Sequence, residues 1–360
     1  MLGWRLGILF AIGGLLGMSL YHAAFGFSSA YRRAFLDRDV SGVFAQLVML
    51  AAAMVLFAPM LAEGEVLGRR VTGGAVAPLG VQVMVGSFLF GLGMQLGGGC
   101  GSGSLYTVGG GSARMVVTLA AFCLGGFWTS FDMPWWAATP RWGAISLAGE
   151  LGWPKALALQ LAVLAAIWAG LRKWQGEGPR TPFWDAHFDW QFVARGPWPL
   201  LLSALLLAVL NGGTVVVSGH PWSITWGFTL WAAKAAQAVG WDPTTVPFWT
   251  ERFTGAALSR GLWQDVTSVM NIGIVLGALM AAGLAGRFSP VLRIPAWSLL
   301  AAVLGGLAMG YGARIAFGCN IGAFFSGIAS TSLHGWLWII FALGGTWIGI
   351  RLRPLFGLGN

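Results

Sequence analysis

Charged residues are scarce in this chain. Only 9% of its 360 residues are Asp, Glu, Lys or Arg, while 57% are hydrophobic, and the mean hydropathy is +0.73. Soluble globular domains contain about 25% charged residues, so a water-soluble fold is excluded. Short segments of alternating polarity, which a transmembrane β-barrel needs, are also absent. The composition therefore predicts an all-α polytopic membrane protein.

Several catalytic and cofactor motifs are missing as well. The sequence contains no Gly-x-x-x-x-Gly-Lys-Ser/Thr motif, so the chain does not itself hydrolyse ATP. Its four histidines are scattered and show no spacing typical of a metal or haem site. Its three cysteines lie in apolar or glycine-rich surroundings and do not make a disulfide framework. We therefore expect no enzyme activity and no cofactor.

The net charge of +9 does not indicate a nucleic-acid partner. The basic residues lie between apolar runs rather than in clusters with stacking aromatic residues. In that position they orient the protein in the membrane and contact the anionic lipids of the bilayer.

Nine apolar runs reach the length of about 20 residues that a helix needs to cross the hydrocarbon core. They cover residues 6–25, 42–62, 80–97, 113–131, 156–172, 199–217, 266–285, 297–315 and 334–352. The longest hydrophilic stretch, about residues 173–198, joins two halves, 1–172 and 199–360, of one membrane domain that occupies residues 1–360. With the N-terminus outside, twelve of the 21 basic residues fall on the cytoplasmic side of the cell inner membrane, which favours an outside N-terminus and a cytoplasmic C-terminus.

Two segments 219 residues apart are similar to each other. Residues 86–128 align without a gap with residues 305–347, and eleven of the 43 aligned residues are identical. The pair Gly99-Cys100 aligns with Gly318-Cys319, and both segments contain Leu-Gly-Gly-x-Trp. The segments are five spans apart, an odd number, so the second lies inverted relative to the first. Inverted repeats place their broken helices together near the middle of the bilayer.

Two further breaks resemble these, at residues 26–33 and 219–223, and they are also five spans apart. We expect four units, each a span followed by a glycine-rich break and a short helix. Together they predict a pseudo-two-fold, hourglass-like molecule with a central constriction at which a transported substrate meets the cysteines.

The cysteine breaks have a chemistry that suits a sulfur-containing anion. Glycine-rich backbone leaves N–H groups free to face a cavity and bind an anion, and a thiol is a soft, weakly donating group. The alternative is that each cysteine simply packs, which is our interpretation of Cys123 because it aligns with Ala342 inside a span. The candidate path residues in the breaks are Gly99, Cys100, Gly101, Ser102 and Gly103 in the first copy and Gly318, Cys319, Asn320 and Gly322 in the second.

Five residues outside the cysteine breaks are also candidates. Arg314 is an intramembrane cation that either attracts an anion or bonds to nearby carbonyls. The residue aligned with it in the first copy is Gln95. His220, Pro221 and Trp222 either line a vestibule or start a short helix. Ser28 is a polar residue at the first break.

At these residues the chain resembles the YeeE/YedE family of sulfur-compound permeases, over essentially its full length. The resemblance rests on Gly-Gly-Cys-Gly-Ser-Gly at 98–103, Phe-Gly-Cys-Asn-Ile-Gly at 317–322 and Gly-His-Pro-Trp at 219–222. It implies thiosulfate uptake along an hourglass-shaped path, with Cys100 and Cys319 as relay thiols, and a cytosolic sulfur-carrier protein of the TusA type as a partner. The family's first break often has Gly-Phe-Cys, whereas this chain has Ser28, which favours an altered step there or a different sulfur species.

Two other functions fit the same residues. A membrane thiol-disulfide oxidoreductase would pair Cys100 with Cys319, although no Cys-x-x-Cys motif is present. An uncharged-solute channel would use the glycine breaks and leave the thiols without a role.

Overall fold

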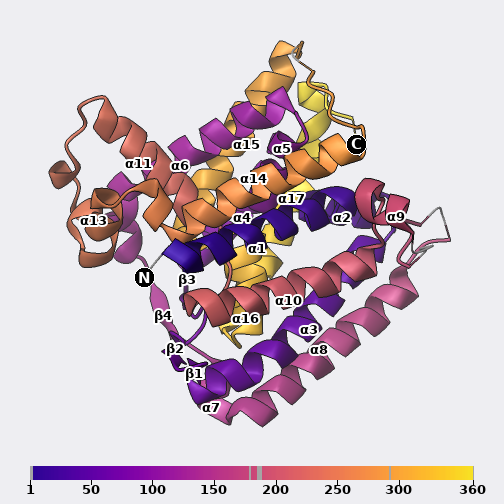
Figure 1. The fold of residues 1–360 in the computed structure, drawn as a ribbon, viewed down its shortest axis with the longest axis horizontal. Helices are drawn as coiled ribbons and strands as arrows, with labels where there is room; N and C mark the ends of the chain where they lie inside the picture. The colour runs from indigo at the N-terminus through magenta and orange to yellow at the C-terminus, as the bar shows by residue number, and fades with distance from the viewer. Residues whose placement is uncertain (1–2, 178–179, 185–188, 292, 360) are drawn as a thin grey trace.

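The computed structural model describes residues 3–177, 180–184, 189–291 and 293–359 and is built mainly of helices (Figure 1). Within that part of the chain, nine helical segments are long and apolar enough to cross a membrane. The long helices are α1 (Gly3–His22), α3 (Ser41–Glu63), α4 (Val81–Gly97), α6 (Ala113–Ala137), α8 (Trp153–Trp174), α10 (Leu200–Ser218), α14 (Val266–Leu284), α15 (Ala296–Ile315) and α17 (Leu333–Leu352). The nine predicted spans are confirmed to within a few residues, the main difference being that α6 continues to Ala137.

Short helices follow four of these spans. They are α2 (Phe27–Asp37) after α1, α5 (Gly101–Gly109) after α4, α11 (Thr225–Ala238) after α10, and η3 (Asn320–Phe325) with α16 (Ser326–Ala329) after α15. The predicted arrangement of span, break and short helix is therefore present at all four positions. The first break is shorter than expected, because the helix resumes at Phe27 and Ser28 lies inside it.

The remaining elements are small and lie in the connections. They are the strand pairs β1 (Glu65–Val66) with β2 (Arg69–Arg70) and β3 (Pro78–Gly80) with β4 (Arg141–Ala144), and the helices α7 (Leu147–Leu151), α9 (Trp190–Arg195), η1 (Pro243–Thr245), α12 (Pro247–Thr250), α13 (Arg252–Ser259), η2 (Leu262–Gln264) and η4 (Arg353–Phe356). Both strand pairs are antiparallel.

The long helices pack closely through glycines. Helix α4 packs on both α15 and α17, and α15 also packs on α6. A Cβ added at Gly93 would lie 2.7 Å from the carbonyl oxygen of Gly305, and one added at Gly312 would clash with the carbonyl oxygen of Gly86. Without a hydrophobic force between helices in lipid, such close backbone contact supplies the association energy. Replacing these glycines would push apart α4 and α15, the spans that precede the two cysteines.

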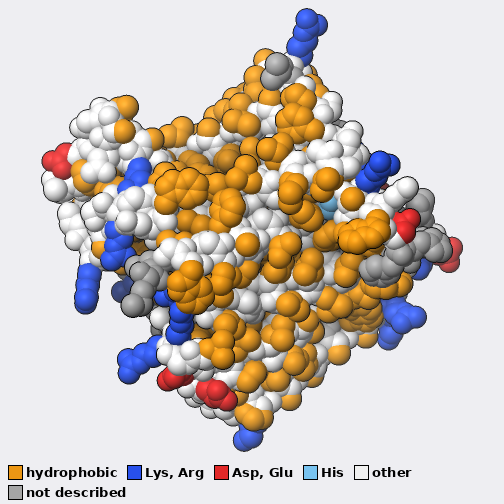
Figure 2. Space-filling model, in the orientation of Figure 1, with side chains coloured by type: hydrophobic (Ala, Val, Ile, Leu, Met, Phe, Trp, Pro, Cys, Tyr) orange, Lys and Arg blue, Asp and Glu red, His pale blue; other side chains and the backbone are white. Residues whose placement is uncertain are grey.

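The surface of the bundle is apolar. Hydrophobic side chains cover most of the face in Figure 2, and the Lys, Arg, Asp and Glu side chains lie around its margins. Helix α8 is the most peripheral span, with 17% of its apolar window buried, and it packs on α3 and α7. This distribution fits a multi-pass membrane protein whose outer face contacts lipid.

The polar linker of residues 173–198 is described only in part. Its Thr181 donates to Asp39 Oδ2 from both the backbone N–H (3.1 Å) and the hydroxyl (2.7 Å). Burial opposes ionisation of Asp39, but these bonds and those from Ser41 outweigh it and hold the pKa of the carboxyl below its usual value. The linker is therefore attached to the loop between α2 and α3.

Candidate functional site

Cys100 begins the short helix α5. Helix α4 ends at Gly98 in a left-handed conformation (φ 91°), and Cys100 is the extended N-cap residue of α5. Its Sγ accepts from the N–H of Gly103 at 3.4 Å and lies 3.4 Å from the hydroxyl of Ser102. The thiol is 1% exposed. It therefore occupies the positive end of a helix, where an oxygen cap usually lies.

Cys319 has the same position in the second copy. It follows Phe317 (φ 60°) and Gly318 (φ 149°), is the N-cap residue of the π-helix η3, and its Sγ accepts from the N–H of Ile321 at 3.5 Å. A Cβ on Gly318 would lie 2.8 Å from the backbone nitrogen of Ala323, so only glycine fits there. Cys319 is completely buried. π-Helical turns are rare and occur frequently at functional sites.

The two cysteine breaks meet at Gly101. A Cβ added to Gly101 would lie 3.2 Å from Cys319 Sγ and 3.5 Å from a side-chain carbon of Ile224. Gly322 in turn faces Ser223, whose hydroxyl would lie 3.4 Å from an added Cβ. The break at 219–224 therefore joins the two cysteine breaks at one point.

The first break also reaches this point. Phe27 packs edge-to-face on Phe324 with ring centroids 6.4 Å apart. The Ser28 hydroxyl donates to the carbonyl oxygen of Met94 at 3.0 Å, and the carbonyl of Ser28 accepts from Gln95 Nε2 at 3.0 Å. Ser28 is thus held against the end of α4 by two hydrogen bonds.

The four breaks therefore lie together, and so do the candidate residues within them. Asn320 is the least satisfied of the candidates: it is fully buried, and neither its amide oxygen nor its amide nitrogen has a hydrogen-bond partner. Trp222 is buried with its backbone N–H bonded to Asn211 Oδ1 at 2.8 Å, while its indole N–H is unpaired.

A partly open pocket of 870 Å³ leads to the second cysteine break. Its lining includes His220, Pro221 and Trp222 from the third break, Arg314 from α15, and Phe317 and Gly318 directly before Cys319. Arg252 and Arg260 of the α13 region and Asp265 also line it. Three arginines against one carboxylate make the pocket attractive to anions.

Arg314 is the buried cation of this pocket. Its guanidinium lies over the rings of Trp226 and Phe248, with centroid distances of 5.7 and 5.4 Å. Its Nε is buried without a hydrogen-bond partner, and no carboxylate of the described residues lies within 4 Å of it. Among the described residues, Arg314 donates no hydrogen bond to a carbonyl.

His220 lines the pocket, with Nδ1 2.8 Å from the carbonyl oxygen of Pro221. Burial lowers the pKa of its imidazole, and the contact with Pro221 opposes this shift. The fixed positive charge of the pocket comes from its arginines.

Three arginines that the sequence did not single out surround the end of α4 just before Cys100. Arg114 donates to the carbonyl oxygens of Leu96 and Gly97 at 2.6 and 2.7 Å, and Arg353 donates to that of Gln95 at 2.7 Å. Arg32 lies 3.5 Å from Gln95 Oε1 and, like Arg114, interacts electrostatically with Arg353. None of the three has a carboxylate within 4 Å in the described part of the chain.

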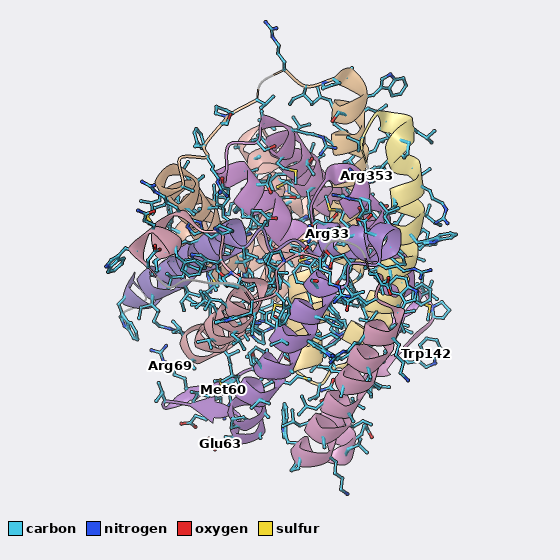
Figure 3. The ribbon with its side chains drawn as sticks, turned by 90° about the vertical axis from the view of Figure 1, so that its right-hand side faces the viewer. Arg33, Met60, Glu63, Arg69, Trp142 and Arg353 are labelled. Carbon is cyan, nitrogen blue, oxygen red and sulfur yellow. The ribbon has the colours of Figure 1, made fainter. Side chains whose placement is uncertain are left out.

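The sequence carried a weak signal for this cluster, since all three arginines lie at or near span ends, on the side predicted to be cytoplasmic. Figure 3 labels Arg353 of this cluster and Arg33, which follows Arg32 in the sequence. The two lie in the same part of the view, away from Met60, Glu63 and Arg69. Arg33 differs from the cluster in having an acid partner, Asp39, at 3.7 Å.

Comparison with known proteins places the chain in a family. The model of the sulphur transport family matches residues 22–348. The thiosulfate transporter TsuA of Spirochaeta thermophila is 30% identical over 93% of this chain and 95% of its own length. TsuA of Escherichia coli is 24% identical over 95% and 94% of the two chains, and the probable transporter YedE of the same species is 31% identical over 46% and 40%. The chain therefore belongs to the sulphur transport family of multi-pass membrane proteins.

Proposed function

We propose that the protein takes up thiosulfate, or a similar small sulfur anion, across the cell inner membrane along a central path on which Cys100 and Cys319 contact the cargo. The observation that carries the proposal is the meeting of two buried thiol-bearing breaks at Gly101, where Cys319 Sγ approaches the residue next to Cys100. Relatives over nearly the whole chain are named thiosulfate transporters.

The packing of the helices supports an origin in two inverted repeats. The main contacts between the two halves have counterparts when helices α1, α3, α4 and α6 are exchanged for α10, α14, α15 and α17, respectively. The packing of α1 on α14 corresponds to the packing of α10 on α3. In the same way, the packing of α6 on α15 corresponds to the packing of α17 on α4. The close contact between Gly93 and Gly305 has its counterpart in the close contact between Gly312 and Gly86, which are the residues aligned with them. A pseudo-two-fold axis between α4 and α15 explains this reciprocity and brings the two breaks together.

Charge on the two sides of the thiols supports a path for an anion. The pocket with Arg314, Arg252 and Arg260 lies before Cys319, and the arginines around the end of α4 lie next to Cys100. A dianion entering the pocket gains electrostatic attraction. It then meets two thiols, which are weak donors suited to a terminal sulfur atom. Weak contacts at successive positions allow the cargo to leave again.

The thiols do no covalent chemistry in this account. Each S–H donates to the terminal sulfur of thiosulfate, and the cargo passes from Cys319 to Cys100 with no bond made or broken. The same pocket would be the outer mouth if the N-terminus is outside, as the distribution of basic residues favours. A cytosolic sulfur carrier of the TusA type would then collect the anion on the opposite side, next to the linker of residues 173–198.

The test is uptake of labelled thiosulfate by cells or proteoliposomes that contain the protein. We expect Cys100→Ala and Cys319→Ala each to lower uptake at least tenfold, while the matched control Cys123→Ala keeps it. Normal uptake in both single variants would overturn the relay.

Two further readouts separate the alternatives. Mass spectrometry that finds a Cys100–Cys319 disulfide during turnover would favour a thiol-disulfide oxidoreductase. Permeation of glycerol without selectivity for sulfur anions would favour an uncharged-solute channel.

A further inference from the structure

Two buried polar side chains next to the thiols have no hydrogen-bond partner. The Tyr31 hydroxyl belongs to a residue that is 3% exposed, and Asn320 is fully buried. The hydroxyl oxygen of Tyr31 and both polar atoms of the Asn320 amide lack partners. A buried donor without an acceptor is unfavourable, so native proteins rarely retain several in one place without a ligand or a water to bind them.

The two side chains come from different halves of the protein and face each other. Tyr31 lies one helical turn after Phe27 in α2, and Phe27 packs on Phe324 of η3. The Tyr31 hydroxyl interacts with the Asn320 side chain and, electrostatically, with Cys100, but the contact with Asn320 falls short of a hydrogen bond. Asn320 directly follows Cys319. A phenol, an amide and two thiols therefore surround one point.

These groups have complementary chemistry. The phenol O–H and the amide N–H₂ are hydrogen-bond donors that suit an oxyanion, whereas the thiols suit a soft sulfur atom. Thiosulfate has both ends: three oxygens on its central sulfur and one terminal sulfur. Bonds from neutral donors to a charged oxyanion are stronger than bonds between neutral groups.

We propose that Tyr31 and Asn320 bind the oxygen end of thiosulfate while Cys100 and Cys319 contact its terminal sulfur, so that the four residues form one two-ended binding site. This inference rests on the function proposed above and names the residues that recognise the oxyanion. It gives the site selectivity for a species with both a sulfur and an oxyanion end over species with only one.

The test uses Tyr31→Phe, which removes one hydroxyl and keeps the ring, with Tyr21→Phe as the matched control outside the site. Uptake kinetics are measured for thiosulfate, and hydrosulfide, which has no oxygens, serves as a competitor. We expect Tyr31→Phe to raise the KM for thiosulfate about tenfold, with the rate at saturation largely retained and the competition by hydrosulfide unchanged. Asn320→Ala is the second variant and is expected to act in the same direction.

Three results are decisive. A KM in Tyr31→Phe equal to that of Tyr21→Phe overturns the inference. So does an equal loss of thiosulfate affinity and hydrosulfide competition, because a purely structural role weakens every ligand alike. If the unmodified protein takes up no thiosulfate, the proposed function itself fails, and direct binding of thiosulfate to the purified Tyr31→Phe variant still tests the site.

Discussion

The two cysteine breaks share one backbone plan and differ in the side chains around it. In each, a span ends, a cysteine becomes an N-cap, and its sulfur accepts a backbone N–H. At the aligned position before the cysteine, Gln95 binds Ser28, the second residue of α2, whereas Arg314 lies over Trp226, the second residue of α11. One contact is a neutral hydrogen bond, and the other leaves a cation facing a pocket.

In the inverted-repeat arrangement proposed above, this difference is how the two halves acquire unlike ends. The backbone turns and glycine contacts are retained because both halves must pack through the same interface. The polar residues at the rim are free to diverge, because they lie outside that interface. Charge at the Cys319 side is therefore open to a ligand, while the arginines at the Cys100 side are largely bonded to the carbonyls of Gln95, Leu96 and Gly97.

The largest expected effect is a loss of stability when Gly318, the glycine directly before Cys319, is replaced. The aligned glycine before Cys100, Gly99, is the comparison. Gly318→Ala places a side chain at φ 149° and 2.8 Å from the backbone of Ala323. A Cβ at Gly99 would instead lie 2.7 Å from the flexible end of Met115 and 3.3 Å from the backbone of Gly103. We expect Gly318→Ala to lose roughly 1–3 kcal/mol of stability or more and Gly99→Ala considerably less. Thermal unfolding in detergent and the amount of protein in the membrane measure both. Equal losses would mean that the two breaks are constrained alike.

The next effect concerns the charge in the pocket. Arg314→Gln gives the second copy the residue type of the first and is expected to raise the KM for thiosulfate about tenfold at low ionic strength. In the described chain the guanidinium has no carboxylate within 4 Å and interacts with Glu251 only at longer range, so its loss removes an attraction for the anion rather than a close ion pair. Arg314→Lys keeps the charge and is the control. An unchanged KM in Arg314→Gln would place the cargo elsewhere.

The smallest effect lies at the first break. Ser28→Ala removes the hydrogen bond to the carbonyl of Met94 and is expected to cost about 1 kcal/mol of stability. Uptake should be nearly unchanged, because the hydroxyl is occupied by this bond and is not free for the cargo. A large loss of uptake with normal stability would show that Ser28 contacts the substrate directly.

The sequence predicted the backbone of the site better than its side-chain contacts. The internal repeat located both cysteine breaks, because glycines that must approach another helix leave a pattern along the chain. Tyr31 belongs to no motif, and its encounter with Asn320 depends on how α2 packs on η3. Arg114 and Arg353 are single basic residues near span ends, a position that many membrane arginines occupy. The far wall of the pocket, near α13, comes from a polar connection that carries no periodic signal.

The central claim is that the sulfur end of the cargo lies between the two thiols. It is tested most directly by a structure determined with selenosulfate, whose selenium replaces the terminal sulfur and gives an anomalous signal. The account predicts a selenium peak within about 4 Å of the Cys100 or the Cys319 sulfur. A fully occupied selenium peak elsewhere in the protein, with the Cys319 sulfur still beside Gly101, would contradict it.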